Sequence, residues 1–183
     1  MQQPTRIIPP ETFDLQAIRL RRPRLSDAEA IFEYASDPDV VRYMDWPRSL
    51  AVEPIIEAIR ERAKLWDLGK EFSWVITLPT ADHAIGGVSC QVDRHAVEFG
   101  YLLNKNYWGR GLATILSKEI SGWALSNPSI SRIWATCDFE NLASARVLEK
   151  SGFLREGRLR RAIVRPNLSA EPRDAFIYSR VRP

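Results

Sequence analysis

Three consecutive apolar runs constrain the fold of this chain most, because only very short polar segments separate them. The runs are FSWVITL at 72–78, AIGGVSCQV at 84–92 and AVEFGYLL at 96–103, joined by PTADH and DRH. Runs of this length, rich in β-branched and aromatic residues, are typical of strands, and connections this short join antiparallel neighbours. The sequence therefore predicts a three-stranded antiparallel meander.

Helical and strand-like patterns alternate on both sides of this meander. A strand over 18–25 leads into a helix over 26–35, where Ser26 and Glu29 form the S-x-x-E of a capping box. A second helix is expected over 52–68, with Gly69 as its stop signal. Downstream we predict a helix over 112–125, a strand over 132–138, a helix over 141–152, and strands over 153–159 and 175–181. This order indicates one mixed α/β or α+β domain over 1–183, with 1–14 as a leader of little fixed structure.

Composition favours an ordinary globular protein without a metal site. The chain has 183 residues, of which 45% are hydrophobic and 27% charged, and no apolar run approaches the roughly 18 residues of a membrane span. The first residues lack a secretion signal, so we expect a cytoplasmic protein that does not bind membranes. Cys90 and Cys137 lie in apolar strand-like runs, and His83 and His95 lie in turns. We therefore expect buried reduced thiols and no metal ligands.

The segment from residue 155 to the end is strongly basic. It carries eight arginines against three acidic residues, a net charge of +5, whereas the rest of the chain carries −2. Such a segment could bind nucleic acid, an acidic protein or a polyphosphate-bearing ligand, and composition does not choose among them. Because it contains no nucleic-acid-reading motif and few interleaved aromatics, we expect no direct nucleic-acid binding.

The stretch NYWGRGLAT at 106–114 places Gly109 and Gly111 around Arg110, directly before a predicted helix. Glycine there costs roughly 0.5–1 kcal/mol relative to alanine, so the chain needs it for a reason. Either the two glycines only shape a turn, or they let a phosphate approach the free N–H groups of the helix start, with Arg110 beside it. The stretch is neither a Walker A motif nor a dinucleotide fingerprint, because Thr114 stands where the third glycine would be.

Three segments together resemble a known family. They are EFGYLLNKNYWGRGLAT, NLASARVLEKSGF and the opening IRLRRPRLSDAEAIFEYASDPDVVRYMDW. In this order and spacing they resemble the GCN5-related N-acetyltransferases (GNAT), and most closely the RimJ/RimL-like ribosomal-protein acetyltransferase branch. The resemblance covers nearly the whole chain. It implies a single GNAT-like α+β domain with a central, twisted, mostly antiparallel sheet and helices on both faces.

The resemblance also implies an activity. Members of the family transfer acetyl from acetyl-CoA to a primary amine by direct attack on the thioester. For the RimJ/RimL-like branch the expected acceptor is a protein N-terminal α-amine, for example on a ribosomal protein. A homodimer is common in the family.

The family's cofactor-binding pattern can be placed on this sequence residue by residue. Its Q/R-x-x-G-x-G/A turn falls on Trp108, Gly111 and Ala113. By resemblance, main chain over 109–114 faces the pyrophosphate and main chain over 101–103 pairs with the pantetheine arm. The implied cofactor contacts are Tyr101, Leu102, Leu103, Gly109, Arg110, Gly111, Leu112, Ala113, Thr114 and Asn141. Asn141 is equally suited to cap the following helix.

Two positions depart from the general family pattern. Trp108 replaces a polar residue, as we associate with the RimJ/RimL branch, and Leu148 stands where many members carry a tyrosine that protonates the leaving thiolate. In RimL-like members a serine three residues after the asparagine is the proposed donor, and Ser144 matches it. Ser144 is a poor acid, so its expected role is a hydrogen bond to the departing sulfur. It is also an acceptable first-turn helix residue.

Glu98 is the candidate general base. It alternates with Val97 and Phe99, so it points to the opposite face of the strand and could act through a water. It could instead be a solvent-facing carboxylate. The other carboxylates that could reach the site are Asp45, Glu71, Asp138 and Glu140. The aromatics that could wall the acceptor side, or simply belong to the core, are Tyr43, Trp46 and Trp74.

A modest base suits an α-amine better than lysine. The α-amino pKa lies near 8 and that of lysine near 10.4, so deprotonating lysine at neutral pH costs about 3 kcal/mol more. Two alternatives stay open. One is the same reaction on a small amine such as a polyamine, an amino acid or a drug. The other is a CoA-binding protein without turnover, for which the missing tyrosine at Leu148 speaks.

Overall fold

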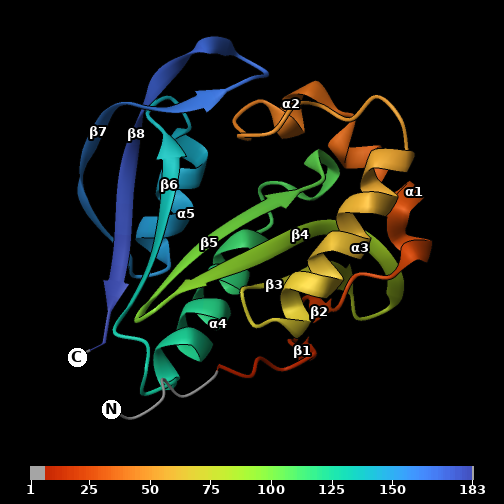
Figure 1. The fold of residues 1–183 in the computed structure, drawn as a ribbon, viewed down its shortest axis with the longest axis horizontal. Helices are drawn as coiled ribbons and strands as arrows, with labels where there is room; N and C mark the ends of the chain where they lie inside the picture. Colours follow the sequence, from red (N-terminus) through yellow and green to blue (C-terminus); the bar gives the residue numbers. More distant parts are fainter. Residues whose placement is uncertain (1–6, 183) are drawn as a thin grey trace.

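A computed structural model describes residues 7–182 as an eight-stranded open sheet with helices against both faces (Figure 1). The strands are β1 Thr12–Asp14, β2 Arg19–Arg21, β3 Glu71–Leu78, β4 Ala81–Asp93, β5 Ala96–Leu103, β6 Arg132–Asp138, β7 Leu154–Arg165 and β8 Ser169–Val181. The helices are α1 Ala28–Ala35, α2 Pro38–Val41, α3 Glu53–Asp67, α4 Leu112–Ser126 and α5 Leu142–Lys150, with single 3₁₀ turns at η1 Leu25–Asp27 and η2 Lys105–Tyr107.

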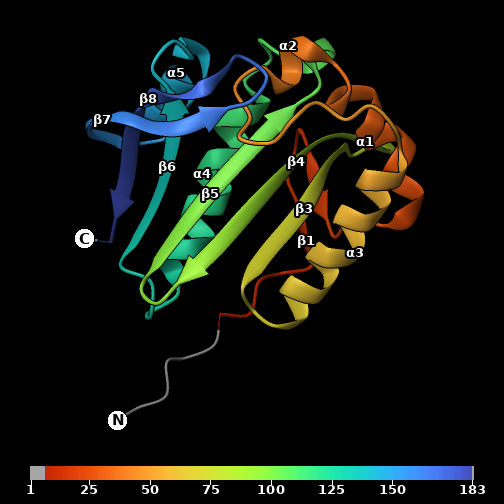
Figure 2. The same ribbon diagram turned by 45° about the horizontal axis from the view of Figure 1, so that its top comes forward.

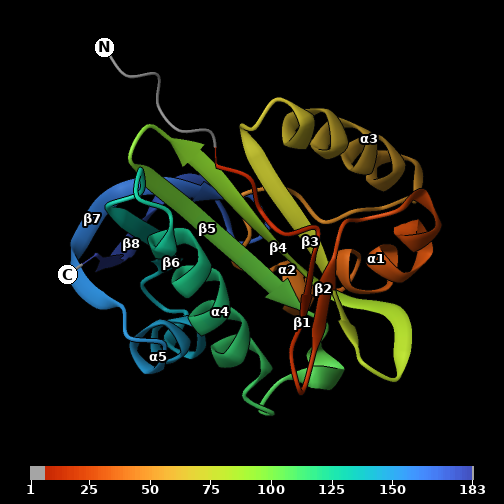
Figure 3. The same ribbon diagram turned by 90° about the horizontal axis from the view of Figure 1, so that it is seen from below.

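The sheet order is β1-β2-β3-β4-β5-β6-β8-β7, and every neighbouring pair is antiparallel except β5 and β6. Helices α1 and α3 cover one face and α4 and α5 the other, as the view from below shows (Figure 3). The predicted α+β class and the β3–β4–β5 meander are thus confirmed. No helix in the described part of the chain is long and apolar enough to cross a membrane.

An aromatic cluster fills the core around β3. The Trp74 ring makes edge contacts with Phe13, Trp66 and Trp123 at centroid distances of 5.1–5.7 Å. Its indole N–H donates to the Pro10 carbonyl at 3.0 Å. Trp74 is therefore a core residue and not part of an acceptor wall. Of the expected leader over 1–14, residues 12–14 form β1 and Phe13 is buried in this cluster, whereas residues 1–6 lie outside the described part.

The predicted capping box at Ser26 is wrong. Ser26 lies inside η1, and α1 begins at Ala28 without a side-chain cap. Its neighbour Asp27 is buried and accepts from the Arg24 N–H at 2.7 Å and from both terminal nitrogens of Arg21, at 2.8 and 2.7 Å. The carboxylate of Asp27 accepts the N–H at the start of η1, which is the role that the S-x-x-E pattern had assigned to Glu29. It also neutralises the buried guanidinium of Arg21.

The β7–β8 hairpin is much longer than the two predicted strands. Its tip folds over the loop that follows α2 (Figure 2), where the Asn167 amide donates to the carbonyls of Val41 and Trp46 at 2.8 and 2.9 Å. Pairs such as Arg158–Asp174 and Arg161–Glu171 join its two strands. The basic C-terminal segment is therefore an ordered hairpin in which several arginines already have acidic partners.

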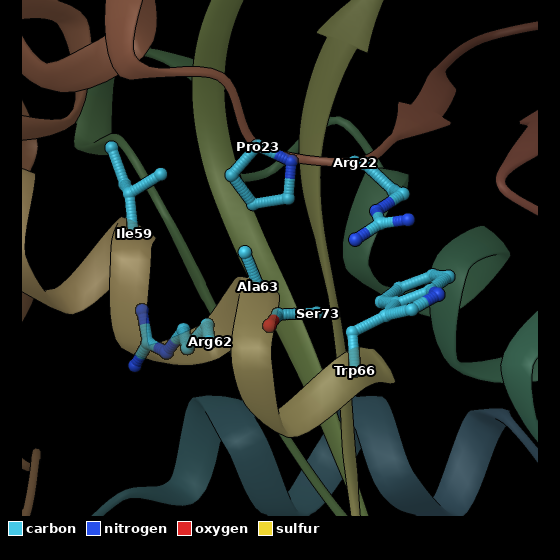
Figure 4. A pocket seen from close by; sticks show the side chains of 7 residues that line it. All are labelled: Arg22, Pro23, Ile59, Arg62, Ala63, Trp66 and Ser73. Atoms are coloured by element: carbon cyan, nitrogen blue, oxygen red, sulfur yellow. The ribbon is translucent and has the colours of Figure 1, made fainter. Parts of the chain in front are cut away.

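A small cavity lies between α3 and β2–β3 (Figure 4). Its walls include Ile59, Ala63 and Trp66 of α3 and Ser73 of β3. With a volume of about 10 Å³ it has room for about one water molecule. It is too small to hold a substrate.

Candidate active site

Strands β5 and β6 form the only parallel pair in the described sheet, and they diverge after a short stretch of pairing. Their register covers just Ala96–Arg132, Val97–Ile133 and Glu98–Trp134. Beyond Glu98, β5 continues along β4 while β6 continues along β8, and the two strands separate (Figures 1 and 2). The β6-facing edge of β5 from residue 99 onward therefore has no strand partner.

Alternation along β5 decides which main-chain groups face this divergence. The Asn104 N–H donates to Ile85 of β4 at 2.8 Å, so Leu102 is also directed toward β4, whereas Tyr101 and Leu103 are directed away from it. The Leu103 carbonyl already accepts from the Trp108 indole at 2.7 Å. Tyr101 therefore presents both its N–H and its carbonyl to the divergence. The Leu102 main chain, which we expected from the sequence to pair with a cofactor, pairs with Gly87 of β4 in the sheet.

The two glycines of the turn before α4 adopt a left-handed backbone. Gly109 has a φ of 75° and Gly111, the N-cap of α4, a φ of 76°. A Cβ added at either position would meet no protein atom within 4 Å. Backbone conformation, rather than crowding by the protein, is thus the first reason for glycine here.

This turn presents a row of free donors. Among residues 7–182, no acceptor is bonded to the main-chain N–H groups over 109–113, which include Leu112 and Ala113 of the first helical turn. The Thr114 N–H is different, because it donates to the Gly111 carbonyl at 3.0 Å. Both glycines and Arg110 are exposed. An anion at this turn would therefore find free donors over 109–113 but not the N–H of Thr114.

Positive charge lies beside this helix start and also further along α4. The Arg110 guanidinium donates to the Asn106 carbonyl at 2.8 Å and lies over the Tyr107 ring at 5.1 Å, which holds it beside the turn. A depression of about 500 Å³ between α4, the end of α5 and β8 is lined by Lys118, Gly122, Lys150, Ser151, Gly152 and Arg180. Sequence reasoning missed these cations because each stands alone in its element. Together they favour a ligand with several negative charges.

Ser144 and Tyr101 bring two hydroxyl groups together across the divergence. The Ser144 Oγ lies 3.4 Å from the Tyr101 hydroxyl, and Asn141 caps α5 by accepting from the Ser144 N–H at 3.1 Å. Burial raises the pKa of Tyr101 to about 12, while the hydrogen bond with Ser144 acts in the opposite direction. Sequence reasoning used only the main chain of Tyr101. Its alternation with Phe99, on which it stacks, could have indicated the side-chain position.

No polar group occupies the position of Leu148, where many family members carry a tyrosine. The Leu148 side chain is buried in the main core cluster, so no polar group reaches the divergence from that position. Tyr101 on β5 and Ser144 one turn earlier on α5 are the hydroxyls that lie in this region instead.

Glu98 lies on the opposite face of β5 from Tyr101. It is half-buried between the buried Val97 and Phe99, and it has no ion pair within the described residues. Burial raises the pKa of Glu98, and the negative charge of Asp45 raises it further. A carboxyl group with a raised pKa is closer to the proton affinity needed for a base near neutral pH.

The other candidate carboxylates are mostly engaged. Asp138 is buried and accepts two hydrogen bonds from Arg173, at 2.7 and 3.1 Å, which lower its pKa although burial acts against them. Glu140 pairs with the same arginine at 2.7 Å, and Glu71 lies 3.5 Å from Arg62. In residues 7–182, no three His, Cys, Asp or Glu side chains are placed to hold a metal ion.

Comparison with known proteins matches this chain to acetyltransferases. The family described as "Acetyltransferase (GNAT) domain" matches residues 17–154. The "Uncharacterized N-acetyltransferase YoaA" of Bacillus subtilis is 31% identical over 167 residues, which cover 90% of this chain and 93% of that protein.

Two solved structures share the fold at lower identity. The microcin C7 self immunity acetyltransferase MccE, in complex with acetyl-CoA and AMP, has a TM-score of 0.82 at 23% identity over 91% of this chain and 93% of its own. An acetyl transferase from Salmonella typhimurium, described as modifying the N-terminal serine of ribosomal protein L7/L12, has a TM-score of 0.80 at 18% identity over 92% and 97%.

Proposed function

The chain belongs to the GNAT acetyltransferase family and is an N-acetyltransferase, and we propose that it transfers acetyl from acetyl-CoA to the α-amine of a protein N-terminus. The observation that carries the cofactor assignment is the row of unpartnered N–H groups over 109–113. These donors lie at the start of a helix and next to the unpaired edge of β5, which is where a diphosphate with a long amide-bearing arm would find partners.

This chain's residues have separable roles toward the cofactor. The N–H groups over 109–113 and the cation of Arg110 receive the pyrophosphate, while the Tyr101 carbonyl accepts from the arm. Asn141 keeps its side-chain NH₂ free for the cofactor, because its oxygen caps α5. Acetyl-CoA supplies the thioester. That MccE of the same fold was solved with acetyl-CoA supports this assignment.

The acceptor side is defined by Glu98. Acting through a water, it takes the proton that the attacking amine must lose, and the Tyr101 N–H stabilises the developing oxyanion. The Tyr101 and Ser144 hydroxyls, on the other face of β5, donate to the departing sulfur. The raised pKa of Glu98 supports an α-amine, whose own pKa is about two units below that of lysine. Likeness in fold to an enzyme named for an N-terminal serine supports the same class and a RimJ/RimL-like placement.

Acetyl-CoA at about 100 times its Kd is expected to raise the Tm by roughly 5–10 °C, because that occupancy adds about 2.7 kcal/mol to the stability of the folded state. ATP and NAD at the same concentration should shift the Tm little. Differential scanning calorimetry measures this directly. Equal shifts from all three ligands would remove the cofactor assignment. With acetyl-CoA bound, turnover on peptides against polyamines and drugs then decides the acceptor class.

Ser144→Ala and Tyr101→Phe are each expected to lower kcat about tenfold, because each removes one hydroxyl from the pair that meets the sulfur. The Kd for acetyl-CoA should stay within about twofold, which separates this role from cofactor binding. Ser126→Ala, at the far end of α4, is the control and should leave kcat unchanged. If the double variant turns over like the parent, neither hydroxyl serves the reaction.

A further inference from the structure

Arg165, at the end of β7, is a buried cation without a partner. Its residue exposure is 6%, it forms no ion pair within the described part of the chain, and its Nε has no acceptor. Arg21 is buried to the same 6%, but two carboxylates, Asp27 and Asp82, hold it. Buried charges are normally paired, so an unpaired guanidinium at this depth requires an explanation.

The surroundings of Arg165 place it on the acceptor side of β5. Two residues further along, Asn167 fixes the hairpin tip to the loop after α2, accepting from the Arg48 N–H at 2.8 Å and donating to the Trp46 carbonyl. Asp45 belongs to this same loop. The negative charge of Asp45 acts both on Arg165 and on Glu98, so Asp45 lies near each of these two side chains.

The nearest buried carboxylate does not neutralise Arg165. Asp138 contributes to the field at Arg165, but its oxygens already accept from Arg173 and from the Glu140 N–H. Burial lowers the pKa of Arg165, and the acidic neighbours only partly oppose this. The guanidinium therefore still has donors for an anion that comes from outside the chain.

We propose that Arg165 binds a carboxylate of the acceptor, and that the preferred acceptor is a peptide whose first or second residue is acidic. This rests on the proposed acetylation of N-terminal amines. Glu98 and Asp45 present negative charge to the amine, and Arg165 presents a planar donor pair to a carboxylate close to it. Opposite charges at the two ends orient the acceptor and disfavour polyamines, which carry no anion. A free acidic amino acid shares this chemistry and is the second source to test.

The test compares two peptides that differ only in Asp or Asn at the first two positions, with acetyl-CoA saturating. We expect kcat/KM about tenfold higher for the acidic peptide, with most of the difference in KM. Arg165→Met should abolish this preference while the acetyl-CoA-induced Tm shift persists. Arg160→Met removes an exposed arginine of the same strand and should keep the preference.

The outcomes are distinguishable. Equal rates for the two peptides in the unaltered protein overturn the role of Arg165 and leave N-terminal acetylation standing, whatever the variants do. No turnover on any peptide, with acetyl-CoA still bound, overturns the proposed function itself. Faster acetylation of free aspartate than of either peptide would overturn the proposal that the acidic acceptor is a peptide.

Discussion

Glu98→Gln is expected to lower kcat/KM for the acceptor about 100-fold or more at neutral pH, which is the range that a general base contributes. Glutamine keeps the size and hydrogen-bonding shape of the side chain but cannot accept the proton. Because Glu98 has no ion pair among the described residues, the substitution should not disturb the fold. Initial rates with a peptide acceptor, and the Kd for acetyl-CoA as a reference, measure the effect.

The pH dependence of kcat/KM for the same reaction should shift in a direction that can be measured. The carboxylate form of Glu98 is the active one, and burial and Asp45 both raise its pKa, so the acid limb of kcat/KM should lie at higher pH than for a surface glutamate. Asp45→Asn removes the second cause and should move this limb to lower pH. In Glu98→Gln, residual activity should rise with pH as the amine loses its proton unaided.

Glu71→Gln is the matched control. Glu71, on β3, lies 3.5 Å from Arg62 of α3 and is two strands from Glu98 in the sheet. It is not one of the causes that raise the pKa of Glu98, so its substitution should leave both the rate and the pH profile unchanged. A Glu98→Gln variant with the parental rate and profile would show that the base lies elsewhere, and Asp45 would then be the one sequence-predicted candidate carboxylate left without an ion pair among the described residues.

The elements that frame the site follow from local pattern. The predicted strands over 96–103 and 132–138 coincide with β5 and β6, because buried residues alternate along both. The glycines at 109 and 111 indicated the turn, since only glycine adopts its left-handed backbone without strain. The sequence also predicted that Asn141 could cap the following helix, and its side chain does cap α5.

The hydrophobic pattern of the sequence does not show which distant segments pair with each other. The middle of the β7–β8 hairpin is mostly exposed and shows no alternation of buried and exposed residues, because ion pairs and main-chain bonds rather than a core hold it together. The hairpin tip over the α2–α3 loop, and hence the position of Arg165 near Asp45, depend on Asn167 bonding to residues more than 100 positions away. The Tyr101–Ser144 contact likewise joins a strand and a helix that are neighbours in space, although the two residues are 43 positions apart in the sequence.

Gly111→Ala is expected to weaken acetyl-CoA binding by about 10- to 100-fold. Alanine at a φ of 76° is strained by roughly 1–2 kcal/mol, and relief of that strain turns the N–H groups at the start of α4 away from a common point. A hydrogen bond to a charged acceptor contributes about 1.5–3 kcal/mol, so losing even one gives this change in Kd. Isothermal titration with acetyl-CoA measures it.

Loss of stability must be separated from loss of cofactor contacts, and Gly69→Ala does so. Gly69 ends α3 with a φ of 69°, nearly the same left-handed backbone, but lies far from the turn in sequence. Both variants should lose a similar free energy of unfolding, whereas only Gly111→Ala should bind acetyl-CoA weakly. The protein itself leaves the space around Gly111 free, so the alanine methyl can clash only with a ligand. Parental affinity in Gly111→Ala would mean that the glycine serves the turn alone and that the diphosphate lies somewhere else.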